Sequence, residues 1–227
     1  MGRAYRNRVT FSRGRLASAV LACGVSTALV LASSGAAFAA SGFHVVPARG
    51  KIAGEGYGYY LQREWQIRLD PSSAGTPCHT VAVHGKRVGL LTLTTSGPVT
   101  VSYSCREPAG RPIYAVGLSN ECSSFQGDHG TFGTSGSQLR KCAVSVYKGA
   151  KDTATVDGHP VNVTHLITTT GVYVVPKQNI FGSGKGRSVA HGYGLLFTGF
   201  SKGIHVIHAL ASIGTSRWDI TWTLHVH

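Results

Sequence analysis

Polar and apolar residues alternate without a break over the last ten residues of the chain, 218–227. The even positions carry Trp, Ile, Trp, Leu and Val, and the odd positions carry Asp, Thr, Thr, His and His. Successive side chains of a β-strand point to opposite faces, so this alternation predicts a strand with one face on a hydrophobic core. The other face meets solvent or a ligand. The chain is therefore expected to fold around a sheet that buries this apolar row.

The first 39 residues are predicted to be a signal peptide, which leaves residues 40–227 as a single secreted, β-rich domain. Five arginines and no acid precede an apolar run at residues 16–31, and Ala37-Phe38-Ala39 has the small-residue pattern of a cleavage site. A membrane anchor fits less well because polar residues interrupt the apolar run. A lipoprotein would carry its lipid on Cys23, but the apolar run continues well past Cys23. We expect no membrane span in the mature chain.

The charge of the predicted mature chain is basic. Loss of the five N-terminal arginines leaves 17 basic residues against nine acids, a net charge of +8. Such a charge suits an extracellular polyanion or glycan as partner, but a basic protein without a polyanion partner is the interpretation we favour. Nucleic acid is not an expected partner, because lysine and arginine never occur in runs longer than two and no basic patch can be drawn.

Four cysteines remain after removal of the signal peptide, and an even number in an exported chain predicts two disulfides. They are Cys78, Cys105, Cys122 and Cys142. Of the three connectivities, we prefer Cys78–Cys105 with Cys122–Cys142. Each bond would close a loop of roughly 20–30 residues and stabilise the fold by about 3–4 kcal/mol. A zinc site would need closer cysteine pairs, which are absent.

Short β-strands are predicted along most of the mature chain. They span residues 80–83, 88–95, 99–105, 112–118, 154–156, 171–175, 193–198, 204–209 and 218–226. Gly85-Lys86 and residues 96–98 suit hairpin turns between the first three strands. The fold class is therefore mostly β, either all-β or α+β, with sandwich-like antiparallel sheets, one or two helices and two disulfides.

Two segments are candidates for helices. Residues 135–148 follow a Thr134 or Ser135 cap, and an apolar face there combines Leu139, Ala143, Val146 and Tyr147. The segment Tyr57–Leu69 is ambiguous, since its apolar residues fit a strand with period two and also a helix stripe with a spacing of four. Between the helices, residues 122–136 are predicted to form a long loop fixed by a disulfide.

Several short motifs are spread over the mature chain. They are Trp65…Asp70-Pro71…Cys78, Arg106-Glu107-Pro108-Ala109-Gly110, Asn120-Glu121-Cys122, and Gly192-Tyr193 followed by GFSKGIHVIH at 199–208. Together they resemble a family of exported bacterial proteins of uncharacterised function. The resemblance implies export and a single domain, and it supplies no catalytic residues. Relatives often carry an acid before the Gly-Tyr pair, where this chain has His191.

Residues 199–203 match a serine-hydrolase motif, but the segments around them do not fit the structure that the motif requires. Residues 199–203 read G-F-S-K-G, and Asp219 and His225 follow in the chain order of a catalytic triad. A nucleophile elbow needs a strand before it and a helix after it, whereas the next residues, Ile-His-Val-Ile-His, favour the return strand of a hairpin. We therefore do not expect a triad.

The histidines of the last two strands are candidates for metal ligands. His225 and His227 would project from the same face of the terminal strand, as a metal site requires, although a solvated polar face is the simpler interpretation. His205 and His208 are three residues apart and point to opposite faces of a strand. One of these two is expected in the core, with its ring hydrogen-bonded to the backbone. No metal or other cofactor is predicted.

Two glycine-rich segments complete the candidates. Asp128-His129 could pair an acid with a general base. The simpler interpretation is a turn in which the Asp128 side chain hydrogen-bonds to the nearby backbone, because adjacent residues rarely orient each other for catalysis. Residues 181–188 form a predicted flexible loop in which Lys185 and Arg187 are candidates for binding an anion.

These patterns predict a secreted, disulfide-stabilised, non-catalytic binding or envelope-associated protein, with a polyanion or glycan as a candidate ligand. A histidine-dependent hydrolase or metalloenzyme that uses Asp128, His129, His225 and His227 is the first alternative. A secreted protease inhibitor that presents the loop between Cys122 and Cys142 is the second.

Overall fold

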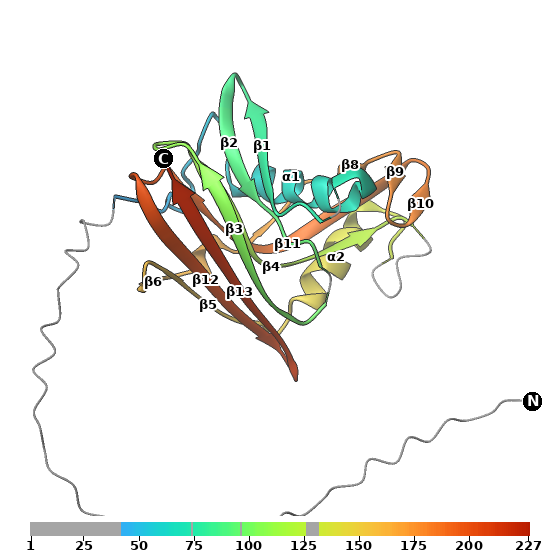
Figure 1. The fold of residues 1–227 in the computed structure, drawn as a ribbon. Helices are drawn as coiled ribbons and strands as arrows, with labels where there is room; N and C mark the ends of the chain where they lie inside the picture. Colours follow the sequence, from blue (N-terminus) through green and yellow to red (C-terminus); the bar gives the residue numbers. More distant parts are fainter. Residues whose placement is uncertain (1–41, 74, 96, 126–131) are drawn as a thin grey trace, which may run out of the picture. The chain divides into compact units, whose positions relative to one another are not determined.

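The computed structural model describes residues 42–73, 75–95, 97–125 and 132–227, so the predicted signal peptide and Asp128-His129 lie outside the described residues. Within the described residues, two large β-sheets, a two-stranded ribbon and two α-helices make up the fold (Figure 1). The helices are α1 (Tyr57–Leu69) and α2 (Gly136–Val146), with the short 3-10 helices η1 (Pro71–Ser73) and η2 (Thr164–Leu166). No helix in this described part is long and apolar enough to cross a membrane.

The first sheet has six strands. Its order is β1 (Cys78–Val83), β2 (Lys86–Leu91), β4 (Ile113–Ser123), β11 (Gly186–Phe197) and β7 (Thr168–Thr169), with β8 (Tyr173–Val175) also paired to β11. The second sheet has the order β3 (Val99–Glu107), β13 (Ser216–Val226), β12 (Gly203–Ile213), β5 (Lys151–Val156) and β6 (His159–Val161). A small ribbon joins β9 (Gln178–Asn179) to β10 (Gly182–Ser183). The mostly β, sandwich-like prediction is confirmed.

The two faces of the first sheet carry different layers. Tyr114 of β4 stacks on Tyr60 of α1, with 5.9 Å between the ring centroids. On the opposite face, the Tyr193 hydroxyl of β11 donates to the carbonyl of Thr153 in β5, 3.5 Å away. Helix α1 therefore covers one face of the first sheet, and the second sheet packs against the other, with the main core between these layers.

The terminal strand β13 has the faces that its sequence predicts. Ile220, Trp222 and Leu224 are at most 1% exposed, whereas His225 is exposed. The ring of Trp222 stacks on Tyr103 of β3 at 4.5 Å. Because β13 lies between β3 and β12, its apolar row is in the middle of the sheet and anchors the core.

One predicted hairpin is correct and one is wrong. β1 and β2 pair as antiparallel neighbours around His84 and Gly85, whose φ angles of 45° and 80° suit a tight hairpin turn. β3, however, does not pair with β2. It crosses to the second sheet and pairs in parallel with β13, and β2 pairs in parallel with β4. Alternation of residues indicates a strand but contains no information about its partner, which explains the error.

The ambiguous segment Tyr57–Leu69 is a helix. Tyr57, Tyr60, Leu61 and Glu64 are buried at spacings of three and four, which places them on the face toward the first sheet. Trp65 adds a hydrogen bond from its indole N–H to the Ser119 hydroxyl, 3.1 Å away.

Helix α2 begins as predicted, with a capping box at Ser135 and Gln138. Leu139, Ala143 and Tyr147 are buried against the first sheet, but Val146 is 39% exposed. Helical periodicity places Val146 near Leu139, but Val146 is the last residue of α2, and the period does not reveal how far the covering layer extends along the helix.

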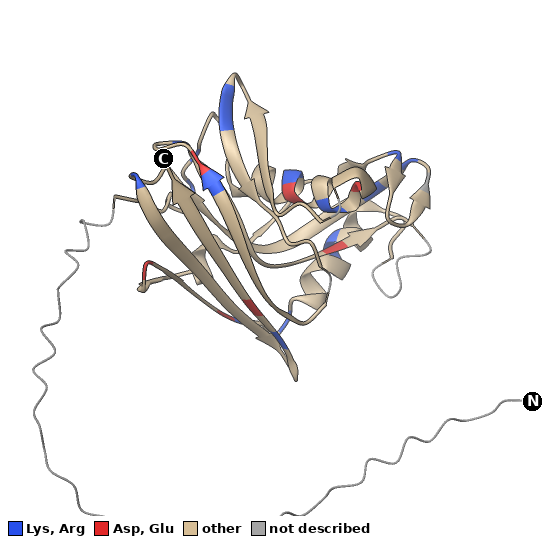
Figure 2. Ribbon diagram, in the orientation of Figure 1, with Lys and Arg blue, Asp and Glu red and all other residues tan. Residues whose placement is uncertain are grey.

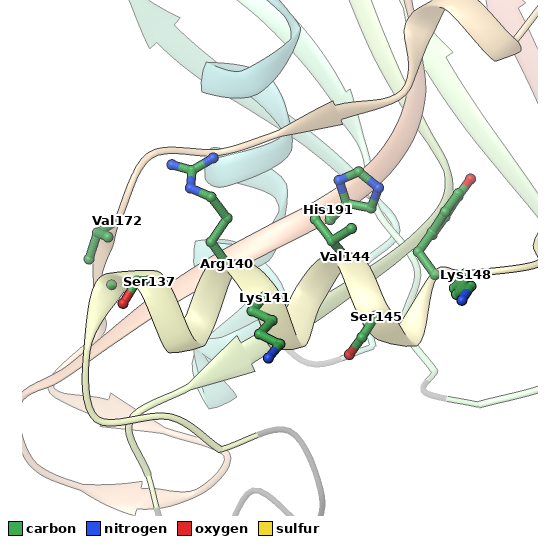
Figure 3. A pocket seen from close by; sticks show the side chains of 10 residues that line it. Ser137, Arg140, Lys141, Val144, Ser145, Lys148, Val172 and His191 are labelled. Atoms are coloured by element: carbon green, nitrogen blue, oxygen red, sulfur yellow. The ribbon is translucent and has the colours of Figure 1, made fainter.

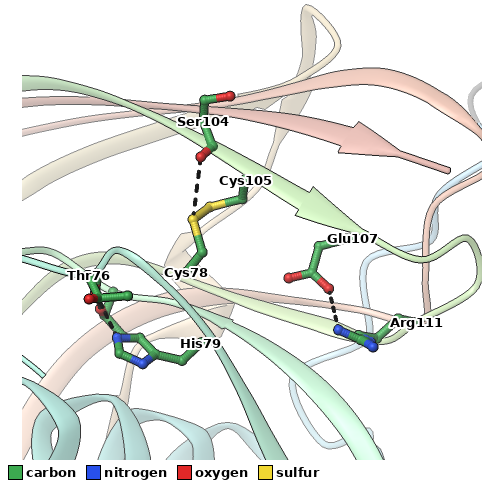
Figure 4. Close-up of a disulfide and its surroundings, with 8 residues drawn as sticks. Thr76, Cys78, His79, Ser104, Cys105, Glu107 and Arg111 are labelled. Carbon is green, nitrogen blue, oxygen red and sulfur yellow. Dashed lines mark hydrogen bonds and ion pairs between the residues drawn. A yellow bond between two sulfur atoms is a disulfide. The ribbon is translucent and has the colours of Figure 1, made fainter.

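Both predicted disulfides are present. Cys78–Cys105 joins β1 to β3, the edge strands of the two sheets, and so closes one side of the sandwich (Figure 4). Cys122–Cys142 fastens α2 to β4. Each disulfide thus adds a covalent link between two layers of the fold.

Candidate ligand groove beside helix α2

The residues of the hydrolase motif do not meet. Asp219 accepts a hydrogen bond from His208 Nε2 at 2.9 Å, on the outward face of the second sheet. His225 lies six residues further along the same strand, about 20 Å away, which is far beyond hydrogen-bonding distance. Ser201 contributes only its carbonyl oxygen, which lies 3.0 Å from His205 Nε2. The segment after the motif is strand β12, as expected for a hairpin.

Of His205 and His208, one of which was predicted to face the core, His205 is the buried one. It is 7% exposed, and Asp157 Oδ2 lies 2.7 Å from its Nδ1. Both ring nitrogens therefore have partners, and the ring is held between the β5–β6 turn and the start of β12. This geometry fixes the imidazole as part of the structure and leaves it no free nitrogen for a metal.

His225 and His227 do lie together, at the end of the second sheet, in a groove of about 360 Å³ that Arg106 also lines. A guanidinium group repels a metal cation and offers it no ligand atom. Within the described residues, no three His, Cys, Asp or Glu side chains are grouped closely enough to hold a metal ion. The groove around His225 and His227 therefore suits an anion better than a metal ion.

The predicted basic loop is mostly strand. Residues 182–183 form β10, and Gly186 begins β11, where Gly186, Arg187 and Ser188 pair with β8. The Arg187 guanidinium donates to the Thr134 carbonyl at 3.0 Å, which ties this segment to the start of α2. Lys185 is exposed in the turn between β10 and β11. Anion binding by these two residues stays a prediction.

A groove with a volume of about 890 Å³ lies beside α2 (Figure 3). We call it the α2 groove. Its residues come from α2 and the two residues after it, from the segment before β8 and from β11: Gly136, Ser137, Arg140, Lys141, Val144, Ser145, Tyr147, Lys148, Val172 and His191. Figure 3 shows Arg140 and Val144 on the side of the helix that faces His191. Sequence elements that are 20 to 50 residues apart thus form one concave surface.

The α2 groove combines apolar surface with positive charge. Val144 is 44% exposed and Val172 is 46% exposed, which leaves two branched apolar side chains open to a ligand. Arg140, Lys141 and Lys148 are exposed at the same surface, and none of the described residues that line it carries a carboxylate. None of the ion pairs found among the described residues involves these three cations. Their charge is therefore available to an anionic ligand.

His191 forms the polar floor of the groove. Its Nδ1 lies 2.7 Å from the Thr169 hydroxyl, and its ring meets that of Tyr147 edge to face at 5.1 Å. The next residue, Gly192, has φ of 153° where the register of β11 shifts, and a Cβ there would lie 2.4 Å from the Leu118 carbonyl oxygen. Only glycine fits this bulge, which fixes the direction of the imidazole.

Burial lowers the pKa of His191, an effect that a backbone hydrogen bond at Thr168 only partly opposes. The imidazole is therefore neutral at pH 7 and acts as a hydrogen-bonding group, not as a fourth cation. Neither serine of the groove is hydrogen-bonded to it. Ser145 donates to the Cys142 carbonyl at 2.8 Å, and Ser137 pairs with the Ser135 hydroxyl at 3.1 Å. Among the described residues that line the groove, neither serine is therefore positioned against a general base that could activate it.

Sequence reasoning missed this groove. His191 was noted only because similar proteins often carry an acid at its position. Arg140 and Lys141 gave no signal, because charged residues are common on the solvated face of a helix. The available signal was Val144, an apolar residue amid the charged face of α2. Elsewhere, lysine and arginine are spread over helices, strands and turns without forming one continuous face (Figure 2).

Comparison with known proteins gives no family. No family model matches the chain, and no curated protein matches it. A solved structure, the solution structure of Amebosin, is 12% identical to this chain. The match covers 58% of this chain and 90% of Amebosin, with a TM-score of 0.20. A likeness at this TM-score carries no argument about fold or function.

Proposed function

We propose that this protein is an extracellular, non-catalytic binding protein that holds an amphipathic anion in the α2 groove. The ligand would have a carboxylate or phosphate head and an apolar body of moderate length. The observation that carries the proposal is a groove of about 890 Å³ whose described residues include exposed valines, three cations outside the ion pairs found among the described residues, and no carboxylate. Two disulfides are compatible with a place outside the cell.

The groove has the size and composition of a small-ligand site. Pockets for drug-sized ligands are typically about 300–1,000 Å³, mainly apolar, with a few polar groups that fix the orientation of the ligand. Here Val144 and Val172 supply the apolar contacts, and Arg140 supplies a planar guanidinium suited to a carboxylate or phosphate. His191 offers a neutral imidazole as a further hydrogen-bonding partner.

The start of α2 adds to the positive potential of the groove. Gly136 and Ser137 line it and belong to the first turn of an 11-residue helix, where backbone N–H groups point out of the helix. Ser135 satisfies the N–H of Gln138, at 3.3 Å. An anionic head group near Gly136 and Arg140 would therefore meet both the helix dipole and a guanidinium group.

A pair of ligands with equal chain length and opposite charge tests the proposal. Decanoate and decyltrimethylammonium, each below its micelle concentration, would be titrated into the protein by calorimetry. We expect decanoate to bind at least about tenfold more tightly, because three cations line the groove and no acid does. Equal binding of the two, or no binding of decanoate, would contradict the proposal.

Matched variants locate the binding. Arg140→Gln and Lys148→Gln should each weaken decanoate several-fold by removing a cation from the groove. Lys86→Gln removes an equal charge at the exposed β1–β2 hairpin and should leave the affinity unchanged. Equal losses for all three variants would mean that net charge, and not the α2 groove, attracts decanoate.

A further inference from the structure

The groove at the end of the second sheet is a second, separate surface. It is lined by Arg106, Gly203, Ile204, His225, Val226 and His227, and we call it the sheet-end groove. Arg106 of β3 and Ile204 of β12 are the register partners of His225 on its two sides. Register partners on neighbouring strands lie about 5 Å apart and point to the same face. Arg106 and His225 are thus fixed side by side by the backbone.

The acids near this groove are already engaged elsewhere. Glu107 follows Arg106 on β3, faces inward with 2% exposure, and accepts a hydrogen bond from Arg111 at 2.9 Å (Figure 4). Burial raises the pKa of the Glu107 carboxyl group, and the nearby Arg111 and His227 oppose this shift only in part. On the outward face, Asp219 accepts from His208. The backbone oxygen of His227 accepts from the Ala109 N–H at 2.9 Å.

Hydroxyl groups continue the outward face from the sheet-end groove along β3 and β13. Thr223 is the register partner of Ser104, and Thr221 is the partner of Ser102. Both serines are exposed and both threonines are half-buried. Successive outward residues on one strand are about 6.5–7 Å apart. The result is a two-column array of hydroxyls that ends at Arg106 and His225.

The aromatic residues of these strands all point the other way. Tyr103 and Trp222 stack within the core, and Trp218 shares their face. Surfaces that bind single-stranded nucleic acids stack bases on exposed aromatic rings, and this face has none among its described residues. Hydroxyl groups beside a guanidinium instead match the hydroxyls and anionic groups of a sugar chain.

We propose that the sheet-end groove binds a phosphate or sulfate group of an anionic glycan, whose neighbouring sugars lie along the hydroxyl array of β3 and β13. Arg106 is the anion-binding residue, with His225 and His227 as hydrogen-bond donors beside it. This site lies on different elements from the α2 groove and shares no residue with it. It goes beyond the proposed function.

Two substitutions on the same face provide the test. Arg106→Gln removes the cation of the groove, and Arg217→Gln removes an exposed cation at the opposite end of β13. Binding of a sulfated heparin-type tetrasaccharide, of its desulfated form and of inorganic phosphate would be measured by calorimetry at 150 mM salt. We expect Arg106→Gln to weaken the sulfated tetrasaccharide at least about tenfold and Arg217→Gln to leave it unchanged. Equal losses in the two variants would overturn the proposal.

A third variant separates the sugar contacts from the anion contact. Thr223→Val removes a hydroxyl from the array, so it should weaken the tetrasaccharide and leave the affinity for inorganic phosphate unchanged. Binding of a single-stranded oligonucleotide as tight as that of the tetrasaccharide, and equally dependent on Arg106, would show that the class of polymer is wrong. Decanoate binding by Arg106→Gln should equal that of the wild type, which keeps this test independent of the α2 groove. Thermal unfolding of each variant verifies the fold.

Discussion

At the scale of the residue, Glu64 of α1 places a carboxyl group where water cannot solvate its charge. The side chain is fully buried, and Arg68 Nη1 lies 3.6 Å from its Oε1. Burial outweighs the attraction of Arg68 and raises the pKa of Glu64 to about 7, from an ordinary 4.5. The carboxyl group is therefore protonated in the folded protein at pH values where it is ionised in the unfolded chain.

The pKa of Glu64 predicts a pH dependence of stability. Between pH 4.5 and 7 the folded state binds one more proton than the unfolded state, so the free energy of unfolding falls as pH rises through this window and levels off above it. Glu64 alone would account for up to ~3 kcal/mol of this loss. Glu64→Gln keeps the shape and removes the charge.

Denaturant unfolding of the wild type and Glu64→Gln from pH 4.5 to 8 checks this account. The difference between the two curves should grow with pH up to about 7, in favour of the variant. Other titrating groups contribute equally to both proteins and cancel in the difference. A difference that stays constant with pH would show that Glu64 is ionised in the folded state.

At the scale of the element, local patterns identify helices and strands well, but partners and layers poorly. β13 was identifiable because residues 218–226 alternate in polarity, and α2 because Ser135 and Gln138 form a capping box. The parallel pairing of β3 with β13 joins segments more than 100 residues apart, which no local pattern indicates. The α2 groove escaped prediction for the same reason, since it exists only where α2 lies against β11.

The two disulfides act on different elements and should have different effects on binding. Each closes a loop, with separations of 27 and 20 residues, and its removal should lower the free energy of unfolding by about 3–4 kcal/mol. Cys122–Cys142 also holds α2, the helix that forms the groove. Replacing Cys122 and Cys142 by alanine should therefore weaken decanoate binding, whereas replacing Cys78 and Cys105 should not.

Chemical denaturation and calorimetry on the two double variants separate stability from binding. Both measurements belong at a temperature where each variant remains folded, as judged by near-ultraviolet circular dichroism. Decanoate affinity that falls by the same factor in both variants would mean that α2 is held in place by packing alone, without help from its disulfide.

At the scale of the whole molecule, the second sheet and α2 occupy the same face of the first sheet, and α1 covers the other. Val189 and Cys122 pack with Leu139 and Ala143 of α2, and Tyr193 reaches β5 from the same face. The core thus uses the inward residues of every layer, and the two proposed binding surfaces lie outside it. One is the α2 groove, and the other is the outward face of the second sheet with its basic end.

Methyl NMR with labelled valines would test whether the α2 groove binds the amphipathic anion that we propose as its ligand. Titration with decanoate should shift the methyl signals of Val144 and Val172, which are exposed in the groove, and leave those of the buried Val88 and Val156 in place. The imidazole signals of His191 should follow the same binding curve. Shifts confined to valines outside the groove, or no shifts at decanoate concentrations up to its micelle point, would contradict the proposal.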